Sequence, residues 1–507
     1  LLAGLVQSPS QYLPYRHPGR ARARQMIILE RMLDNSFIDR EILSAVGSGK
    51  LSSKRHRIPA KAPHYSAMLA HKYPGQQVVS TLDSQLQYHA STTLAQAVKD
   101  APGGTNGAVV ILDNRTGAIR AFAGSAGYDT AGGQINYASR RRGPGSLLKQ
   151  FIDLYAFEHG IVSPATMIND RSGDFNGYAP RNYDRQWHGP VSIRKALAFS
   201  YNVPAVAMLD KIGVDSFTER LERFGLRVPA APERRYGLAL ALGGAEFSLL
   251  ELVRAYSALA RLGTMLPLRF VENASAETPE RIADKDAAFL ICDILKDRSR
   301  LQGRSLWKTG NSPQTFAWKT GTSNNLRDAW TIAWNPDWTV GVMLTCAGLG
   351  RNASLVGIKN AAPTAAALIG LATGNKHNWY QVPKQISRRP VCSRTGLMPC
   401  SACRNTTTDY FQAGFDHTVT CQCGRDKKCD SQPQLISPRA GIVYLDKITL
   451  RADGPEKGEI FWFSGSRYLG RTAFGNTLSC RLSSGTHKIT CSNSKGTWSQ
   501  TVSIRVR

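Results

Sequence analysis

The sequence predicts a mixed fold of helices and strands (α/β, of the α+β type), in which one antiparallel sheet is assembled from distant segments. β-Rich runs lie at residues 107–124 and again at 316–346, whereas helical patterns dominate from about residue 146 to residue 296. Strands at both ends of a helical segment are typical of a single sheet flanked by helices. Short strands separated by Gly and Ser turns over 438–507 predict a small β-sandwich after it.

Each element of this fold follows from a local pattern. A helix with a basic start is expected over 20–32, followed by a linker. A short β run from Val78 leads into Asp83, which is a typical cap for the long amphipathic helix after it. The turn formers of 113–117 predict a hairpin over 107–124. Later strands are expected in the following segments: 316–320, 329–334 and 338–346, with a turn at 335–337.

Length and composition are those of an ordinary globular protein. With 507 residues, 42% of them hydrophobic and 20% charged, the chain has room for roughly three domains of about 150 residues each. Its longest weakly polar stretch, 361–374, is shorter than the roughly 20 apolar residues of a membrane span, so we expect a buried helix there. Because the chain starts without Met or a signal region, we expect an export signal or membrane anchor before it.

The net charge of +27 narrows the class of partner. Lys and Arg are spread over the chain, with only short runs such as Arg140–Arg142, and no zinc-finger, RRM-like or helix-turn-helix signature accompanies them. We therefore expect no nucleic-acid partner. A solvated basic surface is the favoured interpretation, and attraction to an anionic membrane or wall polymer is the alternative.

Cysteine usage indicates an oxidising compartment. Six of the ten cysteines crowd into one segment: Cys392, Cys400, Cys403, Cys421, Cys423 and Cys429. We favour disulfides there. Zinc is the alternative, because the C-x-x-C and C-x-C spacings suit its ligands, although six thiols exceed the four that one structural zinc takes.

The other four cysteines lie in β-like or apolar surroundings. Cys480 and Cys491 flank two predicted strands joined at Ser484-Gly485, so a cross-strand disulfide is expected. Cys292 and Cys346 have apolar neighbours, and we expect buried free thiols.

Three short motifs carry the chemistry. Ser146-Leu147-Leu148-Lys149 follows Gly143-Pro144-Gly145 and opens a helix, so the i, i+3 spacing places hydroxyl and amine on one face. Burial and a neighbouring cation can lower the lysine pKa until the amine accepts the serine proton. Ser200-Tyr201-Asn202 precedes a turn, and Lys319-Thr320-Gly321-Thr322 ends a β run, where the glycine is expected to let a substrate backbone approach.

The third motif occurs twice in the sequence. Lys308-Thr309-Gly310 repeats it but is followed by a loop signal, so Lys319 is preferred.

The motif residues also have a purely structural interpretation. In that interpretation, Ser146 is a helix cap, Lys149 a solvated side chain, Asn202 a turn former and Lys319 a strand-edge charge. The order S-x-x-K, S-x-N, K-T-G argues against that interpretation, because it resembles the signature set of serine transpeptidases and β-lactamases.

A wider resemblance supports the motifs. The chain is similar to the class A penicillin-binding proteins, and more closely to their penicillin-binding protein 1C branch, over nearly its whole length including the terminal sandwich. The stretches that carry this likeness are VSTLD at 79–83, GQIN at 133–136, GPVS at 189–192, GGAE at 243–246 and KTGTSNNLRDAW at 319–330.

The resemblance implies a domain order. It assigns 1–47 to the end of a glycosyltransferase domain, 48–77 to a linker, 78–380 to a serine transpeptidase domain with the penicillin-binding fold, 381–434 to a cysteine-rich linker and 435–507 to the sandwich. The glycosyltransferase glutamates of the family have no counterpart here. This chain is therefore not expected to polymerise glycan, although a complete parent protein is.

The resemblance also implies a reaction, in the periplasm or at the outer face of the cytoplasmic membrane. Ser146 attacks a peptidoglycan stem peptide ending in D-Ala-D-Ala, assisted by Lys149, and β-lactams acylate the same serine. Ser200 and Asn202 relay the proton and hold the amide, while Lys319 and the residues after it bind substrate, as does Tyr201. No metal or other cofactor is required.

Two departures from the family pattern leave other functions open. Gln150 stands where the family has proline, and Gly143 where it has serine. They favour a wall-sensing module that is acylated without turnover. A hydrolase, either a D-Ala carboxypeptidase or a β-lactamase, is a separate alternative, which rapid deacylation by water would mark.

Overall fold

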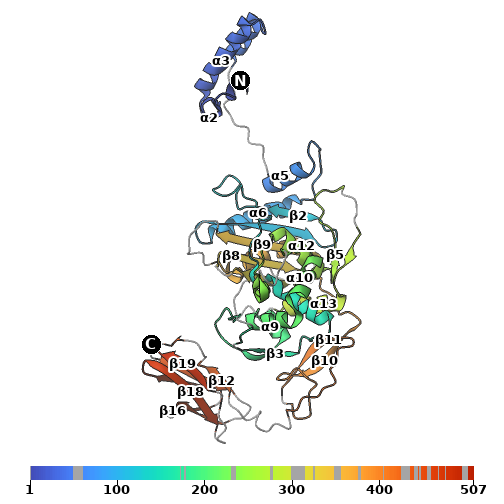
Figure 1. Ribbon diagram of the computed structural model, residues 1–507, viewed down its shortest axis with the longest axis vertical. Coiled ribbons are helices and arrows are strands. Elements are labelled where there is room, and N and C mark those ends of the chain that lie inside the picture. The colour runs from blue at the N-terminus through green and yellow to red at the C-terminus, as the bar shows by residue number, and fades with distance from the viewer. Residues whose placement is uncertain are drawn as a thin grey trace. The chain divides into compact units, whose positions relative to one another are not determined.

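Five antiparallel strands form the central sheet, in the order β2-β1-β9-β8-β7 (Figure 1). β1 pairs with β9 along its length, from Thr105 opposite Cys346 to Asp113 opposite Trp338. The predicted assembly of one sheet from distant segments is therefore confirmed, and β7 is one of its two edges. The strands are β1 (Thr105–Asp113), β2 (Ile119–Ala123), β7 (Ala317–Thr322), β8 (Asp328–Trp334) and β9 (Trp338–Cys346).

The computed structural model describes most of the chain, which divides into two units, Leu1–Lys61 and Ala62–Arg507. The described residues are 2–49, 61–171, 173–175, 178–229, 236–273, 278–297, 315–323, 326–346, 355–374, 378–403, 405–423, 434–438, 443–444, 447–453, 458–465, 467–473, 475–493, 499 and 501–506.

Both faces of the sheet are covered by helices. Side chains alternate between faces along a strand, so Val109 and Ile111 pack with α6 and α14, whereas Val110 and Leu112 join the larger core on the other face. Asp83 caps α6 as predicted, because its Oδ1 accepts the Leu86 N–H at 2.8 Å. The helices that cover the sheet are α6 (Ser84–Lys99), α12 (Leu249–Ala260) and α14 (Ala362–Thr373), the last at the predicted buried helix.

A helical part lies between the two halves of the sheet, as predicted, and it supplies the remainder of the larger core. Its elements are η1 (Gly145–Leu148), α7 (Lys149–Glu158), β3 (Met167–Asp170), β4 (Gly189–Ser192), α8 (Ile193–Ala198), α9 (Asn202–Ile212), α10 (Val214–Arg223), η2 (Gly237–Leu242), β5 (Thr264–Met265), β6 (Glu280–Arg281) and α13 (Lys285–Leu295), with the π-helix η4 (Gly357–Ala361) after the sheet.

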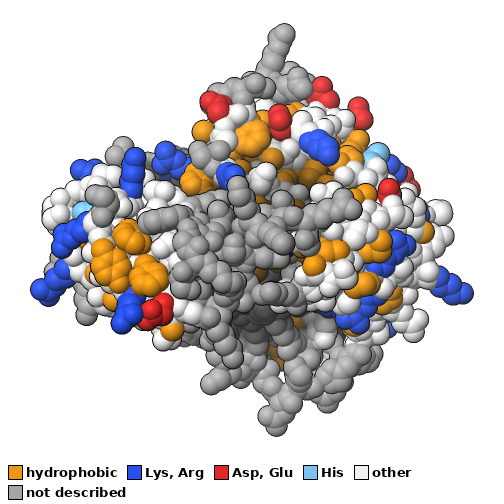
Figure 2. Space-filling model, turned by 90° about the horizontal axis from the view of Figure 1, so that it is seen from below, with side chains coloured by type: hydrophobic (Ala, Val, Ile, Leu, Met, Phe, Trp, Pro, Cys, Tyr) orange, Lys and Arg blue, Asp and Glu red, His pale blue; other side chains and the backbone are white. Residues whose placement is uncertain are grey.

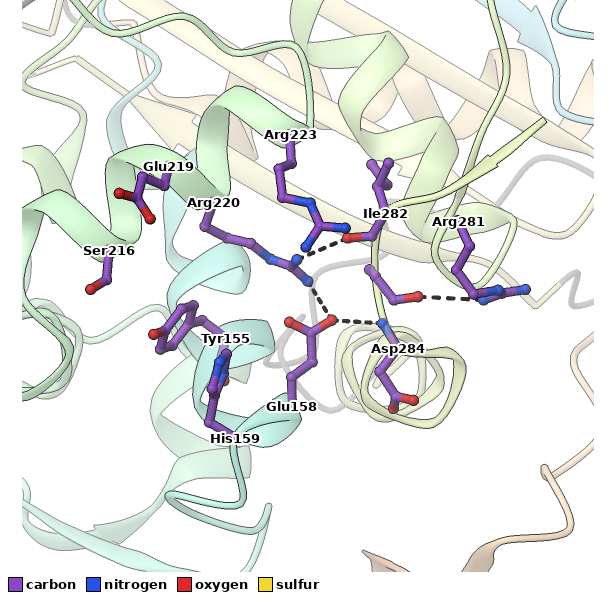
Figure 3. Close-up of a pocket in the computed structure, with 11 residues that line it drawn as sticks. Tyr155, Glu158, His159, Ser216, Glu219, Arg220, Arg223, Arg281, Ile282 and Asp284 are labelled. Carbon is purple, nitrogen blue, oxygen red and sulfur yellow. Dashed lines mark hydrogen bonds and ion pairs between the residues drawn. The ribbon is translucent and has the colours of Figure 1, made fainter. Parts of the chain in front are cut away.

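A buried ion pair ties three of these helices together in a pocket of about 440 Å³ (Figure 3). Arg220 on α10 pairs with Glu158 on α7 and donates to the Ile282 carbonyl at 2.9 Å. Glu158 also accepts the Asp284 N–H at 2.7 Å, at the start of α13. The ion pair and its two backbone contacts therefore hold these three helices together.

Replacing Glu158 with alanine is expected to lower the free energy of unfolding by about 3–5 kcal/mol, because it leaves the Arg220 guanidinium buried without its anion. Urea denaturation measures the change. Glu219→Ala is the matched control, since Glu219 lines the same pocket but is exposed and should cost less than about 0.5 kcal/mol. Equal losses in the two variants would contradict the structural role of the pair.

The first unit contains α1 (Leu2–Leu5), α2 (Pro9–Tyr12), α3 (Pro18–Asp34) and α4 (Arg40–Ser48). The helix expected over 20–32 is α3, which is slightly longer than predicted. In the part of the chain that the structure describes, no helix has the length and apolar character needed to cross a membrane.

The linker expected over 48–77 is only partly correct. α5 (Pro63–Lys72) lies within it and belongs to the second unit. Tyr65 on α5 is 1% exposed, and its hydroxyl donates to the Phe270 carbonyl at 2.7 Å. This helix therefore forms part of the core.

The segment expected to be a cysteine-rich linker, 381–434, also contains regular structure. β10 (Ile386–Cys392) and β11 (Thr406–Gln412) pair as an antiparallel hairpin. Arg194 on α8 binds Asp409 of this hairpin through Nε and Nη2, at 3.0 and 2.5 Å. The hairpin is thus anchored to the helical part by a charged pair.

The C-terminal strands form two sheets around a separate core, as expected for a sandwich. Cys480 on β17 and Cys491 on β18 lie in different sheets, and both are free thiols. The predicted cross-strand disulfide is wrong, because its two strands pair with other strands. The strands of the two C-terminal sheets are β12 (Gln434–Ser437), β13 (Val443–Tyr444), β14 (Lys447–Asp453), β15 (Glu459–Ser464), β16 (Arg467–Ala473), β17 (Thr477–Arg481), β18 (Gly485–Asn493) and β19 (Val502–Val506).

Basic side chains are dispersed over the described surface drawn in Figure 2, where Lys and Arg alternate with apolar and uncharged groups. A single dense basic stripe of the kind that follows a nucleic-acid backbone is not visible on the described part of this face.

Candidate active site

Ser146 lies on η1, a short turn that packs against the edge strand β7. Two glycines allow this close approach. Gly145 has φ +57°, and a Cβ built on it would lie 2.2 Å from the Thr322 carbonyl oxygen. A Cβ on Gly321 would lie 2.0 Å from the Pro144 carbonyl oxygen. The missing side chain of Gly321 thus makes room for the protein's own serine turn, and because Gly321 also lines the neighbouring cavity, the expected approach of a substrate backbone there stays a prediction.

Lys149 begins α7 and points into a set of oxygen atoms from the second motif. Its Nζ donates to the carbonyls of Ser200 at 2.6 Å and Tyr201 at 3.0 Å, and to Asn202 Oδ1 at 2.6 Å. The side chain is 1% exposed. The amine is thus held in one place by three acceptors.

Burial governs the charge of this amine. It lowers the pKa of Lys149 to about 7, although the carboxylates of Asp153 and Asp170 raise it. Three acceptors suit the three donors of an ammonium group, but loss of solvation outweighs them. Near neutral pH, a large share of the molecules therefore holds an uncharged amine that can accept a proton.

Ser200 lies between the two lysines. Its Oγ accepts from Lys319 Nζ at 2.9 Å and lies 3.4 Å from Lys149 Nζ. Its backbone has φ +60°, a conformation that non-glycine residues seldom adopt and that accumulates at functional sites. The hydroxyl therefore connects the amine of α7 with the amine of β7.

The third motif lies on β7, as the sequence predicts. Lys319 is 1% exposed and also donates to the Thr320 carbonyl at 2.8 Å. Thr322 Oγ1 accepts the Gly357 N–H at 3.1 Å, which fixes its side chain. The competing copy of the motif, Lys308 to Gly310, lies outside the described residues.

A single cavity of about 470 Å³ unites most of the predicted residues. Tyr201 is not among the residues that line it: its ring stacks on His188, with centroids 4.0 Å apart. Lys149 and Lys319 reach the cavity through their bonds to Ser200. The lining residues are Ser146, Tyr183, Arg185, Phe199, Ser200, Asn202, Leu242, Thr320, Gly321, Thr322, Ser323, Leu326, Val356 and Ile358.

Sequence reasoning missed the side chains that hold Asn202. Asn182 accepts the Asn202 N–H at 2.7 Å, and Asn182 itself donates to both oxygens of Asp170, at 2.8 and 2.7 Å. Asp170 is fully buried and also bonds His188 Nδ1 at 2.6 Å. No local pattern signals these long-range contacts.

Asp153 was also missed, although a signal was available. It stands four residues after Lys149, the spacing that brings side chains together on a helix. Burial raises the pKa of Asp153 to about 7, while Lys149 and Lys319 lower it. This carboxyl can therefore change charge in the same pH range as the amine.

The two departures from the family pattern, Gln150 and Gly143, are absent from the lining of the cavity. Gln150 is fully buried and donates to the Leu147 carbonyl at 2.6 Å. The carbonyl of Gly143 accepts from Trp330 Nε1 at 3.0 Å, and a Cβ on Gly143 would meet nothing closer than 3.6 Å.

None of the nine cysteines that the structure describes lines this cavity. Cys292 is a buried free thiol, as predicted, and burial raises its pKa to about 12, whereas Cys346 is only partly buried. In the cysteine-rich segment, four described cysteines lie close together: Cys392, Cys403, Cys421 and Cys423. All four are free thiols, so they do not form the disulfides that the sequence favours.

A serine on a helix-opening turn, three residues before a buried lysine whose pKa is lowered, has the kind of groups that serine acyl transfer uses. The chain belongs to the penicillin-binding protein family: the family described as "Penicillin binding protein transpeptidase domain" matches residues 107–370. The "Penicillin-Binding Protein C-terminus Family" matches residues 424–505.

Similar proteins of known sequence belong to the same family. The chain is 33% identical over 350 residues to penicillin-binding protein 1C of Escherichia coli K12, which is 68% of this chain and 44% of that protein. It is 28% identical over 387 residues to penicillin-binding protein 1F of Bacillus subtilis 168, covering 68% of this chain and 52% of that protein. The chain spans about half the length of these curated relatives.

Solved structures share the fold. Penicillin-binding protein 1A from Haemophilus influenzae superposes with a TM-score of 0.63 at 20% identity, covering 82% of this chain and 86% of that one. PonA1 from Mycobacterium tuberculosis in complex with penicillin V gives a TM-score of 0.53 at 19% identity, covering 70% and 93%. The predicted fold class is therefore confirmed.

Proposed function

We propose that this chain is a peptidoglycan D,D-transpeptidase that crosslinks stem peptides through an acyl-enzyme on Ser146. The observation that carries the proposal is the single cavity lined by Ser146, Ser200, Asn202 and residues 320–322, with two buried lysines bonded to Ser200. Membership of a transpeptidase family agrees with it.

In the acylation step, neutral Lys149 Nζ takes the proton of Ser146 Oγ. The oxygen attacks the carbonyl between the two terminal D-Ala residues, an Oγ–C bond forms, and the peptide C–N bond breaks. Ser200, bonded to both amines, passes a proton to the departing D-Ala nitrogen. An amine of a second stem peptide then attacks the ester, so Ser146 is regenerated and a new amide joins the two peptides.

β7 is proposed to hold the donor peptide. As an edge strand, it can pair with an extended peptide through its backbone. The N–H groups of Ser146 and Thr322 would form the oxyanion hole, where one donor contributes about 3 kcal/mol in comparable enzymes. Lys319, Thr320 and Thr322 would bind the terminal carboxylate, and Asn202 the substrate amide. β-Lactams, which imitate this donor, would acylate the same serine.

We further infer the setting from the resemblance of residues 1–47 to a glycosyltransferase domain. The transpeptidase would act within a bifunctional protein that also polymerises glycan, at the outer face of the cytoplasmic membrane. An anionic membrane or wall surface would attract its net charge of +27.

Intact-protein mass spectrometry with a labelled penicillin tests the proposal, followed by incubation with wall peptides. We expect a stable adduct together with crosslinked product. Trypsin should place the label on peptide 143–149 (GPGSLLK), in which Ser146 is the only side-chain hydroxyl. A short-lived adduct would indicate a hydrolase, a permanent one without crosslinking a sensing module, and a label elsewhere would overturn the assignment of Ser146.

A further inference from the structure

Four cysteine sulfurs converge beside the β10–β11 hairpin, outside the proposed active site. The Sγ atoms of Cys392, Cys403, Cys421 and Cys423 all lie within 4.8 Å of one another. The closest pairs are Cys403 with Cys421 at 3.0 Å and Cys392 with Cys423 at 3.5 Å. The sequence offers six candidate thiols; Cys429 lies outside the described residues, and four of the other five form this cluster.

We propose that these four cysteines bind one structural Zn²⁺ as thiolates. Zinc in structural sites is tetrahedral with Zn–S distances of about 2.3 Å, which places the sulfurs about 3.8 Å apart. Four sulfurs around a common point match that requirement. Disulfides require only that sulfurs approach in pairs, at about 2.05 Å, and give no reason for two pairs to meet.

Backbone N–H groups directed at the sulfurs support thiolate ligands. The Cys400 N–H donates to Cys421 Sγ at 3.3 Å. Cys392 accepts hydrogen bonds from the backbone of Arg394 and Thr395. Hydrogen bonds to the ligand atoms orient them and stabilise their negative charge.

The surrounding fold explains why a metal is needed. Among the described residues, the small apolar cluster beside this hairpin has three buried members, Ala165, Val391 and Phe411, and small apolar cores are often reinforced by metals or disulfides. Met398, which lies between Cys392 and Cys403, donates its N–H to the Val419 carbonyl at 3.1 Å and accepts the Cys421 N–H at 2.8 Å, so backbone bonds bring the ligand segments together.

The site would hold the hairpin against the helical part of the transpeptidase domain. Gly396, in the turn after Cys392, lies so close to the preceding domain that a Cβ on it would be 2.0 Å from the Ala165 carbonyl oxygen. Binding zinc replaces four thiol protons with one Zn²⁺ and needs no oxidant. The role is structural, so it stands or falls independently of the proposed transpeptidase reaction.

Elemental analysis of the purified full chain by inductively coupled plasma mass spectrometry tests the site. We expect about one zinc per chain, and a fall of at least about fivefold in Cys403→Ser and Cys421→Ser, since mutating a ligand breaks the tetrahedral set. Cys400→Ser is the matched control from the same loop: Cys400 Sγ lies 3.8 Å from Cys403 Sγ but is not one of the four. The Cys400→Ser variant should keep its zinc.

A titration of the unaltered chain decides the question even if variants misfold. Adding p-hydroxymercuribenzoate should release the zinc to a chromogenic chelator as about four thiols react. The proposal would be overturned by a protein without zinc or with iron in its place. Non-reducing peptide maps that show disulfides among these cysteines would overturn it as well. Equal zinc loss in Cys400→Ser and Cys403→Ser would overturn the assigned ligand set.

Discussion

Replacing Lys149 with methionine is expected to lower the second-order rate constant of acylation by a labelled penicillin by about 10³-fold, because a positioned general base typically contributes 10²–10⁴. Methionine keeps much of the side-chain length but cannot accept the Ser146 proton. Time-resolved labelling followed by mass spectrometry measures the rate. A thermal melt within a few degrees of the parent protein shows that the variant is folded.

The pH dependence gives a second measurement of the same role. Burial lowers the pKa of Lys149 to about 7, so the amine is protonated and inactive below that pH and neutral above it. Acylation by the parent chain should therefore rise through pH 7 and then level off. Asp153→Asn should move the midpoint to lower pH, since the Asp153 carboxylate raises the pKa of Lys149. A profile that is flat from pH 5 to 9, or a Lys149→Met variant of full activity, would contradict the assignment.

The features predicted correctly from the sequence have local causes. The Asp83 cap, the hairpin of β1 and β2 and the strands β8 and β9 each follow from short patterns of capping residues, turn formers and apolar runs. The motifs around Ser146, Ser200 and Lys319 were expected to meet only because their order resembled a known set. Their convergence on one cavity is a tertiary fact that each motif alone does not specify.

The features that were missed or misjudged depend on long-range packing. The hydrogen bonds from Asn202 through Asn182 to Asp170 join the start of helix α9, a loop and the end of strand β3, with no fixed spacing between them. Cys480 and Cys491 have the local signature of a hairpin, yet their strands pair with other strands in separate sheets. The close contact of Gly321 with the serine turn likewise joins distant segments, and no local pattern signals it.

Replacing Gly145 with alanine is expected to reduce acylation about 10²-fold, because a displacement of about 1 Å at a reacting group can cost that much. Two effects combine. The residue has φ +57°, which costs a non-glycine residue roughly 1–2 kcal/mol. Its new Cβ would also lie 2.2 Å from the Thr322 carbonyl oxygen, so the serine turn and β7 must separate, and the two proposed oxyanion donors with them.

Gly143→Ala is the matched control, two residues earlier in the same turn. The nearest atoms to its new Cβ would be the Gly243 carbonyl oxygen at 3.6 Å and Ser323 Cβ at 3.9 Å, both ordinary contacts, so stability should change by less than about 0.5 kcal/mol. If Gly145→Ala were acylated as fast as Gly143→Ala, contact between the turn and β7 would not set the reactivity of Ser146. We expect slow acylation in Gly145→Ala alone. Thermal melts should show that both variants are folded.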